Sequence, residues 1–323
     1  MTATMMDSDT APPRETAPGQ SELSETIFRG LCFGAATLLL AALAGVVISL
    51  AIGGWPAFKQ FGFGFFTSSA WDPVQENYGA AGPIVGTIVT SVLALIIALP
   101  LATGVSVFLV EFCPRNIAKP IAVAVELLAG IPSIVYGMWG LFVLAPWFAI
   151  HVQLPLMTDS ANLPGWLSAL VAGIPNGANI FTASLILAIM ILPYMSAVFR
   201  ELLLTIPAQV REAAYGLGST NFEVVSKVMI PYVRRGAVGV VMLGLGRALG
   251  ETMAVTFIIG NSHGFPHSLF DSGSTIASTI ANEFAEATSD MHTAALIALG
   301  LVLFILTFAV LAVARLLLAS EKH

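Results

Sequence analysis

Charged side chains are scarce in this sequence, and so is cysteine. Only 10% of the 323 residues are Asp, Glu, Lys or Arg and 57% are hydrophobic, whereas an ordinary soluble domain has about 25% charged residues. The two cysteines, Cys32 and Cys113, are too few for a disulfide-stabilised secreted domain. Together with a mean hydropathy of +0.88, this composition excludes an ordinary soluble domain and indicates an integral membrane protein.

The motifs of an ATP-hydrolysing or metal-dependent enzyme are also lacking. A P-loop ends in Gly-Lys followed by Ser or Thr, and none of the four lysines has either residue after it. The five histidines, at positions 151, 263, 267, 292 and 323, show no spacing typical of a zinc site. We therefore expect no catalytic residues, no metal and no cofactor in this chain, so that energy must come from another chain or from an ion gradient.

Long apolar runs are what the sequence does have. A helix needs about 20 residues to cross roughly 30 Å of hydrocarbon. Six runs reach that length, and each is predicted to form one transmembrane helix. They lie near residues 28–52, 84–110, 120–150, 180–204, 236–259 and 291–318. The predicted fold class is all-α, a polytopic membrane protein with six transmembrane helices.

Positive charges are distributed unevenly about these spans. Of the thirteen Lys and Arg residues, all but Lys59 and Arg247 fall on the side of the N-terminus. Loops rich in Lys and Arg stay on the cytoplasmic side of a membrane. The asymmetry predicts a multi-pass protein of the inner (cytoplasmic) membrane with both termini in the cytoplasm. Glu111, Arg115 and Lys119, between the second and third spans, are interpreted as an ordinary solvated loop.

The first 26 residues differ in composition from the rest of the chain. They are rich in Ser, Thr, Pro and acidic residues and have too few apolar side chains to bury a core. We interpret residues 1–26 as a disordered cytoplasmic tail and residues 27–320 as the membrane domain. A signal peptide is not expected, because no short apolar stretch with a small-residue cleavage site precedes the first span.

The cytoplasmic segment between the fourth and fifth spans, about residues 206–232, has a helical pattern that prolines and glycines interrupt. Pro207 suits the first turn of a helix, which would run through Glu212-Ala213-Ala214. Gly216 and Gly218 would end that helix, because glycine adopts the positive φ of a tight reversal.

A second helix is predicted directly after this reversal. Thr220 and Glu223 have the spacing of a capping box, and Pro231 would end the helix. Tyr215 and Leu217 place apolar side chains beside charges, which is typical of a docking surface. The alternative is a helical loop that packs on its own bundle. DNA binding through this helix-turn-helix is excluded, because the membrane would cover its basic side chains and no recognition helix is present, so no nucleic acid partner is expected.

These residues resemble the signature of the membrane subunits of binding-protein-dependent ABC importers. That signature reads Glu-Ala-Ala, three residues, Gly, nine residues and Ile-x-Leu-Pro. Here Glu212-Ala213-Ala214 is followed at matching spacing by Gly218 and by Val228-Met229-Ile230-Pro231, with Val and Ile in place of Ile and Leu. The resemblance implies a type I importer permease fold and a coupling helix that sits in a groove of an ATP-binding subunit. The residues it assigns to coupling are Glu212, Ala213, Ala214, Gly216, Gly218 and Pro231.

Residues before and within the fifth span indicate which kind of importer the chain resembles. Residues 216–218, Gly-Leu-Gly, and residues 242–255, which contain Gly-Arg-Ala-Leu-Gly-Glu-Thr-Met-Ala-Val, resemble the permease subunits of phosphate importers. The Leu-Gly-Glu-Thr-Met-Ala-Val continuation favours one of the two permeases of such importers over its companion. The resemblance implies a second permease subunit, two ATP-binding subunits that hold ATP and Mg²⁺, an external phosphate-binding protein, and inorganic phosphate as substrate.

Arg247 and Glu251 are the charged residues predicted within the fifth span. In a helix that starts near Gly236, Arg247 would lie about 16 Å along the axis, near the bilayer midplane. A charge there costs about 3 kcal/mol or more unless it is paired or hydrated. Glu251, four residues on, would lie one turn along the same face. The alternative to a transport role is an ion pair that fixes helix register against a partner subunit.

The chemistry of this pair suits an oxyanion. Arginine offers a planar fork of donors that matches phosphate oxygens. Glu251 would neutralise Arg247 in the empty state, and it could accept a hydrogen bond from protonated phosphate, which sulfate at neutral pH does not offer.

We therefore expect the permease subunit of an ATP-driven importer that moves inorganic phosphate into the cell. Two alternatives stay open. The substrate could be another oxyanion, such as sulfate or molybdate, or the chain could be an ion-coupled carrier that works alone. The large docking segment and the absence of a visible inverted repeat count against the second.

Overall fold

The computed structural model describes residues 18–158 and 164–319 of the chain. The chain divides into two compact units, Met1–Ser49 and Leu50–His323. Helix α1, Pro18–Phe61, begins in the first unit and ends in the second. It starts eight residues before the predicted end of the disordered tail, at a proline whose fixed φ suits the first turn of a helix. The prediction of disorder for residues 1–17 lies outside the described residues.

Among the described residues, six helical segments are long and apolar enough to cross a membrane, which confirms the predicted all-α class. These candidate spans are Ser24–Phe61, Ala81–Phe112, Ser133–Thr158, Ile180–Leu204, Asn221–Leu249 and Asp290–Leu316. The first, second, fourth and sixth agree with the predicted spans to within about ten residues at each end. The third and fifth differ, for reasons given below.

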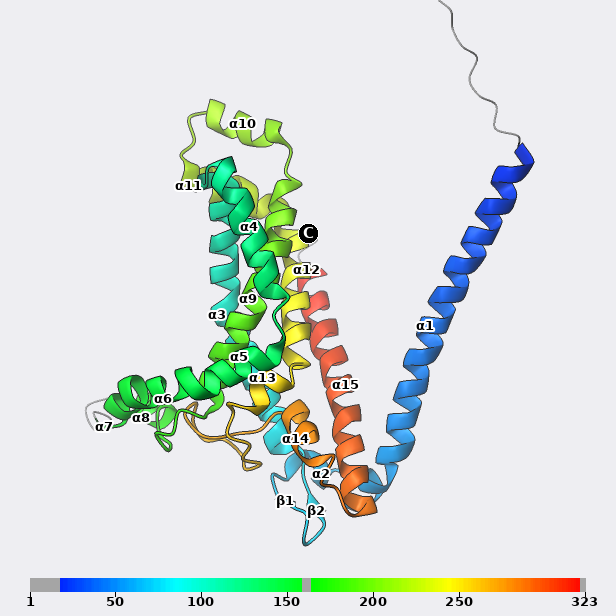
Figure 1. The fold of residues 1–323 in the computed structure, drawn as a ribbon, viewed down its shortest axis with the longest axis vertical. Coiled ribbons are helices and arrows are strands. Elements are labelled where there is room, and N and C mark those ends of the chain that lie inside the picture. Colours follow the sequence, from blue (N-terminus) through cyan, green and yellow to red (C-terminus); the bar gives the residue numbers. More distant parts are fainter. Residues whose placement is uncertain (1–17, 159–163, 320–323) are drawn as a thin grey trace, which may run out of the picture. The chain divides into compact units, whose positions relative to one another are not determined.

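Figure 1 shows the elements of the Leu50–His323 unit in order along the chain. After α1 come α2 (Gly64–Thr67), β1 (Trp71–Asp72), β2 (Asn77–Tyr78), α3 (Ala81–Val107), η1 (Phe108–Phe112), α4 (Arg115–Ala129), α5 (Ser133–Trp139), η2 (Gly140–Leu144), α6 (Ala145–Phe148), η3 (Ala149–Gln153) and α7 (Leu154–Thr158). Then follow α8 (Gly165–Leu170), α9 (Ile180–Leu204), α10 (Ala208–Gly216), α11 (Asn221–Glu223), η5 (Val224–Met229), α12 (Ile230–Leu249), α13 (Met253–Thr256), α14 (Ile276–Glu283) and α15 (Asp290–Ala319).

Helices α3, α9 and α12 form the centre of this unit. Ala94, Ala98 and Ala102 lie four residues apart on α3 and are fully buried, because residues at i and i+4 share one face of a helix. Small side chains on that face let another helix approach closely, as in membrane bundles. On α12, a Cβ added at Gly244 would lie 2.6 Å from the sulfur of Met195 in α9, so α12 also packs closely here.

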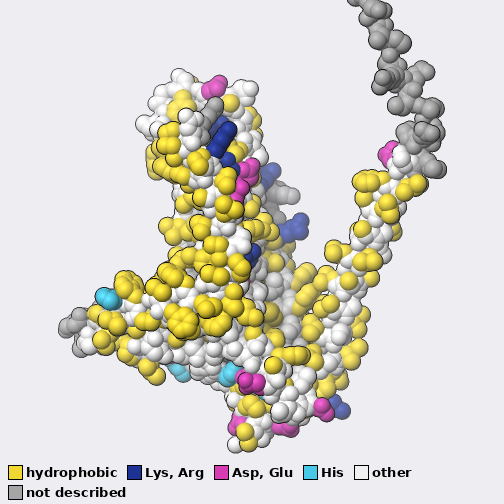
Figure 2. All heavy atoms as spheres, in the orientation of Figure 1, with side chains coloured by type: hydrophobic (Ala, Val, Ile, Leu, Met, Phe, Trp, Pro, Cys, Tyr) yellow, Lys and Arg dark blue, Asp and Glu magenta, His cyan; other side chains and the backbone are white. Residues whose placement is uncertain are grey.

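The unit has two distinct ends (Figure 1). At the coupling end, defined as η1 and α10 to η5, α10 lies beyond the ends of α3 and α9. At the hairpin end, defined as β1, β2, α14, the first turn of α15 and the loop at His263, the antiparallel pair β1–β2 joins Trp71 to Tyr78. In Figure 2, Lys and Arg side chains are seen near α10, whereas hydrophobic side chains cover the middle of the unit.

Four π-helical stretches share a local cause. η1, η2, η3 and η5 each end two residues before a proline: Pro114, Pro146, Pro155 and Pro231. The residue directly before each proline donates its N–H to the carbonyl five residues back, as Cys113 does to Phe108 and Ile230 does to Val225. A proline has no N–H, and its ring clashes with the carbonyl four residues before it. The wider i→i+5 turn separates these groups, which lets the chain stay helical up to the proline or beyond it.

The predicted third span, residues 120–150, is wrong as a single helix. Helix α4 ends at Ala129, Gly130 caps it, and Pro132 is extended, with ψ 136°. Helical backbone is disfavoured at the residue before a proline. The helix therefore ends ahead of Pro132, and α5 starts at Ser133. The apolar run hides this break, and the candidate span begins after it.

Candidate functional site

The predicted fifth span, residues 236–259, is also interrupted, and the break lies at the predicted substrate site. Helix α12 ends at Leu249, Gly250 caps it, and the short helix α13 begins only at Met253. Arg247 is therefore in the last turn of α12, and Glu251 lies beyond its end. The prediction that the two side chains share one helical face is wrong, because the helix stops between them.

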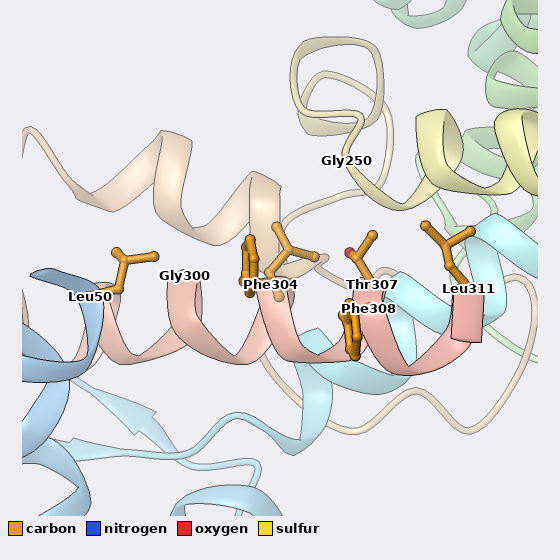
Figure 3. A pocket seen from close by; sticks show the side chains of 8 residues that line it. Leu50, Gly250, Gly300, Phe304, Thr307, Phe308 and Leu311 are labelled. Carbon is orange, nitrogen blue, oxygen red and sulfur yellow. The ribbon is translucent and has the colours of Figure 1, made fainter. Parts of the chain in front are cut away.

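The break in α12 lies level with the middle of a neighbouring span. Gly250 lines an apolar cavity of about 400 Å³ together with Gly300, Phe304, Thr307 and other residues of α15, as Figure 3 shows. These residues are near the midpoint of α15, Asp290–Ala319. Irregular backbone at that depth is tolerated only where protein or a water-filled cavity surrounds it. Arg247 thus lies in the last turn of its candidate span, Asn221–Leu249, next to a break that is level with the middle of α15.

Arg247 is exposed on the surface of this chain. Its guanidinium carbon lies 5.6 Å from the ring centroid of Tyr194 in α9, a distance suited to a cation–π interaction. Tyr136 in α5 is close enough for Arg247 to act on it electrostatically. The aromatic ring supports one face of the guanidinium, which leaves N–H donors at its edge for a ligand.

Glu251 makes a local contact. It accepts a hydrogen bond from the backbone N–H of Ala254, at 3.3 Å, in the first turn of α13. Among the described residues, no ion pair joins Arg247 to Glu251. The two charges flank the helix break, one on each side of Gly250.

The coupling segment largely follows its prediction. Helix α10 starts after Pro207, and Gly218 has φ +85°, a conformation that side chains rarely adopt. The Thr220–Glu223 capping box is present in both directions. Gly216 is the last helical residue of α10, so of the two glycines Gly218 makes the reversal.

Pro231 does not end the second helix, which corrects the prediction. The chain is continuous from α11 through η5 into α12, and Pro231 lies at the start of α12. The π-helical turn ahead of the proline accommodates its ring. The coupling segment therefore leads directly into the helix that carries Arg247.

The surface of the coupling segment is mixed. Glu212 and Ala213 are exposed, whereas Ala214 is buried against the bundle. Leu217 is 88% and Phe222 78% exposed. Apolar side chains this open beside charges are typical of a contact surface.

One residue that the sequence analysis misread is Glu111, at the end of η1. Its side chain is only 10% exposed and lies 3.5 Å from Arg211 of α10. The hydroxyl of Tyr215, also in α10, donates a hydrogen bond to it. That hydrogen bond raises the pKa of Tyr215 to about 12, and burial adds to the effect. Glu111 therefore belongs to a partly buried contact with α10, and the predicted solvated loop is corrected at this residue.

A second buried glutamate, which the sequence analysis also missed, organises the hairpin end. Glu283 accepts hydrogen bonds from Trp71 Nε1 at 2.6 Å, from His292 Nε2 at 2.8 Å, and from His263 Nε2 at 2.7 Å. Burial alone would raise the pKa of Glu283, but hydrogen bonds from His263, Trp71 and His292 together hold it below its ordinary value. The five residues of this group, which we call the Glu283 cluster, are Trp71, Tyr78, His263, Glu283 and His292, with Tyr78 stacked on His292.

Comparison with known proteins gives concordant matches. Residues 112–322 match the family described as binding-protein-dependent transport system inner membrane component. Over 305 residues the chain is 51% identical to the phosphate transport system permease protein PstC of Mesorhizobium japonicum, covering 94% of this chain and 93% of that protein. The PstC protein of Haemophilus influenzae is 50% identical over 299 residues, covering 93% and 94%.

A solved structure is similar in fold. It is a bacterial ABC transporter involved in the import of the acidic polysaccharide alginate, with a TM-score of 0.58 and 17% identity, covering 94% of this chain and 100% of that chain. A likeness at this identity concerns the fold alone.

Proposed function

Because this chain belongs to the binding-protein-dependent transport system inner membrane components, and its curated relatives are phosphate transport permeases, we propose that it is the permease subunit through which phosphate is imported. It is a multi-pass protein of the inner membrane and a transport subunit without an enzymatic site of its own. The family resemblance seen in the sequence is thereby confirmed, and the names of these relatives support phosphate as the substrate.

Arg247 is the residue that receives phosphate in this proposal. It is an exposed charge at the depth where α12 breaks, and a charge at that depth needs a partner or water. Its planar fork suits a tetrahedral oxyanion, and Tyr194 holds one face of it. Glu251, across the break, accepts a hydrogen bond from protonated phosphate and limits how tightly the anion is held.

The coupling segment, about residues 206–232, receives the driving force. Its exposed apolar residues and the sharp turn at Gly218 suit a helix pair that docks in a groove of an ATP-binding subunit. Because α11, η5 and α12 are continuous, movement of this segment is passed along α12 to Arg247. The residues assigned to coupling are Glu212, Ala213, Ala214, Gly216, Gly218 and Pro231.

The complete importer in this proposal contains a second permease (PstA-like), two ATP-binding subunits (PstB-like) and an external phosphate-binding protein (PstS-like). ATP and Mg²⁺ belong to the ATP-binding subunits. The N- and C-termini and the coupling end face the cytoplasm, as the distribution of Lys and Arg supports.

The test is uptake of labelled phosphate into vesicles that contain the chain with its co-purifying subunits. We expect uptake to require ATP and to be reduced by unlabelled arsenate, but not by sulfate or molybdate. Uptake without ATP would contradict the importer class, and equal competition by sulfate would contradict the substrate.

A further inference from the structure

The contact between Glu111 and α10 is one that no sequence motif of the coupling segment includes. Glu111 lies in η1, which is continuous with α3, whereas Tyr215 and Arg211 lie in α10, 104 and 100 residues further along the chain. Both partners use the same carboxylate, since Tyr215 bonds Oε1 and Arg211 approaches Oε2. Charge-assisted hydrogen bonds of this kind are stronger than neutral ones, and a side chain only 10% exposed is little screened by water.

The π-helical turn places the carboxylate for this contact. In η1, the N–H of Cys113 bonds the carbonyl of Phe108, so the last turn before Pro114 is wider than in an α-helix. An extra residue in a turn rotates the residues after it relative to the helix before it. Glu111 is therefore presented by a locally altered turn, and such turns are frequent at functional sites.

A continuous series of contacts leads from Glu111 to Arg247. Ser106, one and a half turns earlier in the same helical run, is fully buried and donates a hydrogen bond to the carbonyl of Ser196 in α9, at 2.9 Å. Tyr194, two residues before Ser196, lies beneath Arg247. The coupling helix is thus joined to the charged residue at the break by a second route, separate from the continuous α11–α12 backbone.

We infer that Glu111 is a positioning residue that clamps the coupling helix α10 to α3, so that movement of α10 reaches α3 and α9 as well as α12. This inference rests on the proposed function, because it assigns a route to the same ATP-driven movement. Without the clamp, α10 would follow the ATP-binding subunit while α3 and α9 lagged behind. Phosphate transported per ATP hydrolysed would then fall.

The experiment uses the complete complex in phospholipid vesicles and measures phosphate uptake, ATP hydrolysis and the amount of assembled complex. The variants are Tyr215→Phe, which removes the hydroxyl and keeps the ring, Glu111→Gln, which removes the charge and keeps an acceptor, and the two together. The matched control is Glu201→Gln. It removes a carboxylate paired with Arg200 at 2.6 Å, but that pair joins adjacent residues of one helix rather than two elements.

The expected result is a fall of about threefold or more in phosphate moved per ATP for the double variant, within the range that coupling mutations produce. Each single variant should fall less, and Glu201→Gln should keep the wild-type ratio. A role in folding alone would lower uptake and hydrolysis together and leave their ratio unchanged.

Two results would overturn the clamp. One is an assembled double variant that moves as much phosphate per ATP as the wild type. The other is an equal fall in Glu201→Gln. If Glu111→Gln does not assemble, Tyr215→Phe, whose ring is retained, decides on its own, and an unchanged ratio for it contradicts the clamp. A wild-type complex that shows no ATP-dependent uptake would instead overturn the proposed function itself, and the clamp with it.

Discussion

The two ends of the Leu50–His323 unit each contain a largely buried glutamate, but the two carboxylates have different surroundings. Glu283 at the hairpin end takes three hydrogen bonds, from Trp71, His263 and His292. Glu111 at the coupling end contacts two side chains, both of them in α10. The first carboxylate holds four segments in one arrangement, and the second joins a single short helix to one span.

This difference indicates which end is built to move. A carboxylate of α14 that satisfies donors from β1, α15 and a loop resists displacement, because moving any one segment leaves a largely buried polar group unpaired. At the coupling end, α10 is connected to its neighbours by the turn at Gly218, the contacts of Glu111 and the buried side chain of Ala214. The hairpin end is therefore the more firmly held of the two, and in the proposed function the coupling end transmits movement to the break in α12 between them.

The largest expected effect is at the residue between the two ends. Arg247→Gln removes the charge and the fork of donors while keeping similar volume, and loss of charged hydrogen bonds to phosphate should reduce uptake by about a hundredfold. The complex should still assemble and hydrolyse ATP. Loss of the assembled complex would instead favour the alternative that Arg247 fixes helix register against a partner subunit.

The turn at the coupling end is the next target. Gly218→Pro forces φ from +85° toward about −65° and misplaces α10. Phosphate moved per ATP should fall by about tenfold, a change within the usual range of coupling free energies. Gly104→Ala is the matched control, because Gly104 is helical, lies in α3 outside the coupling residues and has open space around its Cβ position. A wild-type ratio for Gly218→Pro would refute the assigned hinge.

At the hairpin end, the expected effect is on stability. Glu283→Gln replaces a buried carboxylate that accepts three hydrogen bonds, and should destabilise the protein by about 2 kcal/mol at neutral pH. The control Glu286→Gln changes an exposed carboxylate three residues away and should have little effect. Thermal unfolding of the detergent-solubilised complex measures both. Equal melting temperatures for the two variants would show that the cluster is not an anchor.

The Glu283 cluster also predicts that the stability of the protein depends on pH. Because the folded-state pKa of Glu283 lies below its ordinary value, its stabilising contribution is present above that ordinary value, about 4.3. The contribution is lost as pH falls through the lowered folded-state pKa. The difference in unfolding temperature between wild type and Glu283→Gln should therefore shrink in acid. A difference that grows as pH falls would contradict the assigned hydrogen bonds.

The smallest expected effect is on the phosphate concentration for half-maximal uptake, when the aromatic ring beneath Arg247 is removed. Tyr194→Leu removes the ring under the guanidinium and should raise the phosphate concentration for half-maximal uptake by about threefold to tenfold, as loss of a cation–π contact implies. Tyr194→Phe keeps the ring and should stay close to wild type. Equal values for the two variants would exclude the ring as a support for Arg247.

The sequence was most informative where local rules apply. The Thr220–Glu223 capping box and the reversal at Gly218 follow from spacing and from the freedom of glycine, and the structure confirms both. The breaks at Gly130–Pro132 and Gly250 were missed because apolar residues continue through them. Pro231 was read as a terminator, but the π-helical turn before it lets the helix continue.

The two glutamates could not be predicted in the same way. Trp71 and Glu283 are 212 residues apart in the sequence, and Glu111 and Tyr215 are 104 apart. No spacing rule joins such residues, since only the packed bundle brings them together. Arg247 can be proposed from the sequence because any charge within an apolar run is conspicuous, whereas its neighbour Tyr194 has no such signal.

The most direct measurement tests whether Arg247 lines a water-filled path for phosphate. In a complex in which the two native cysteines of this chain are replaced by serine, Arg247→Cys introduces a thiol at the break. Ile305→Cys introduces a control thiol on α15, where the native side chain is 56% exposed. A membrane-impermeant thiol reagent should label position 247 from the aqueous phase, in a manner that changes with ATP, and should leave position 305 unlabelled. An unlabelled position 247 in every state, or equal labelling of both positions, would contradict a phosphate path past Arg247.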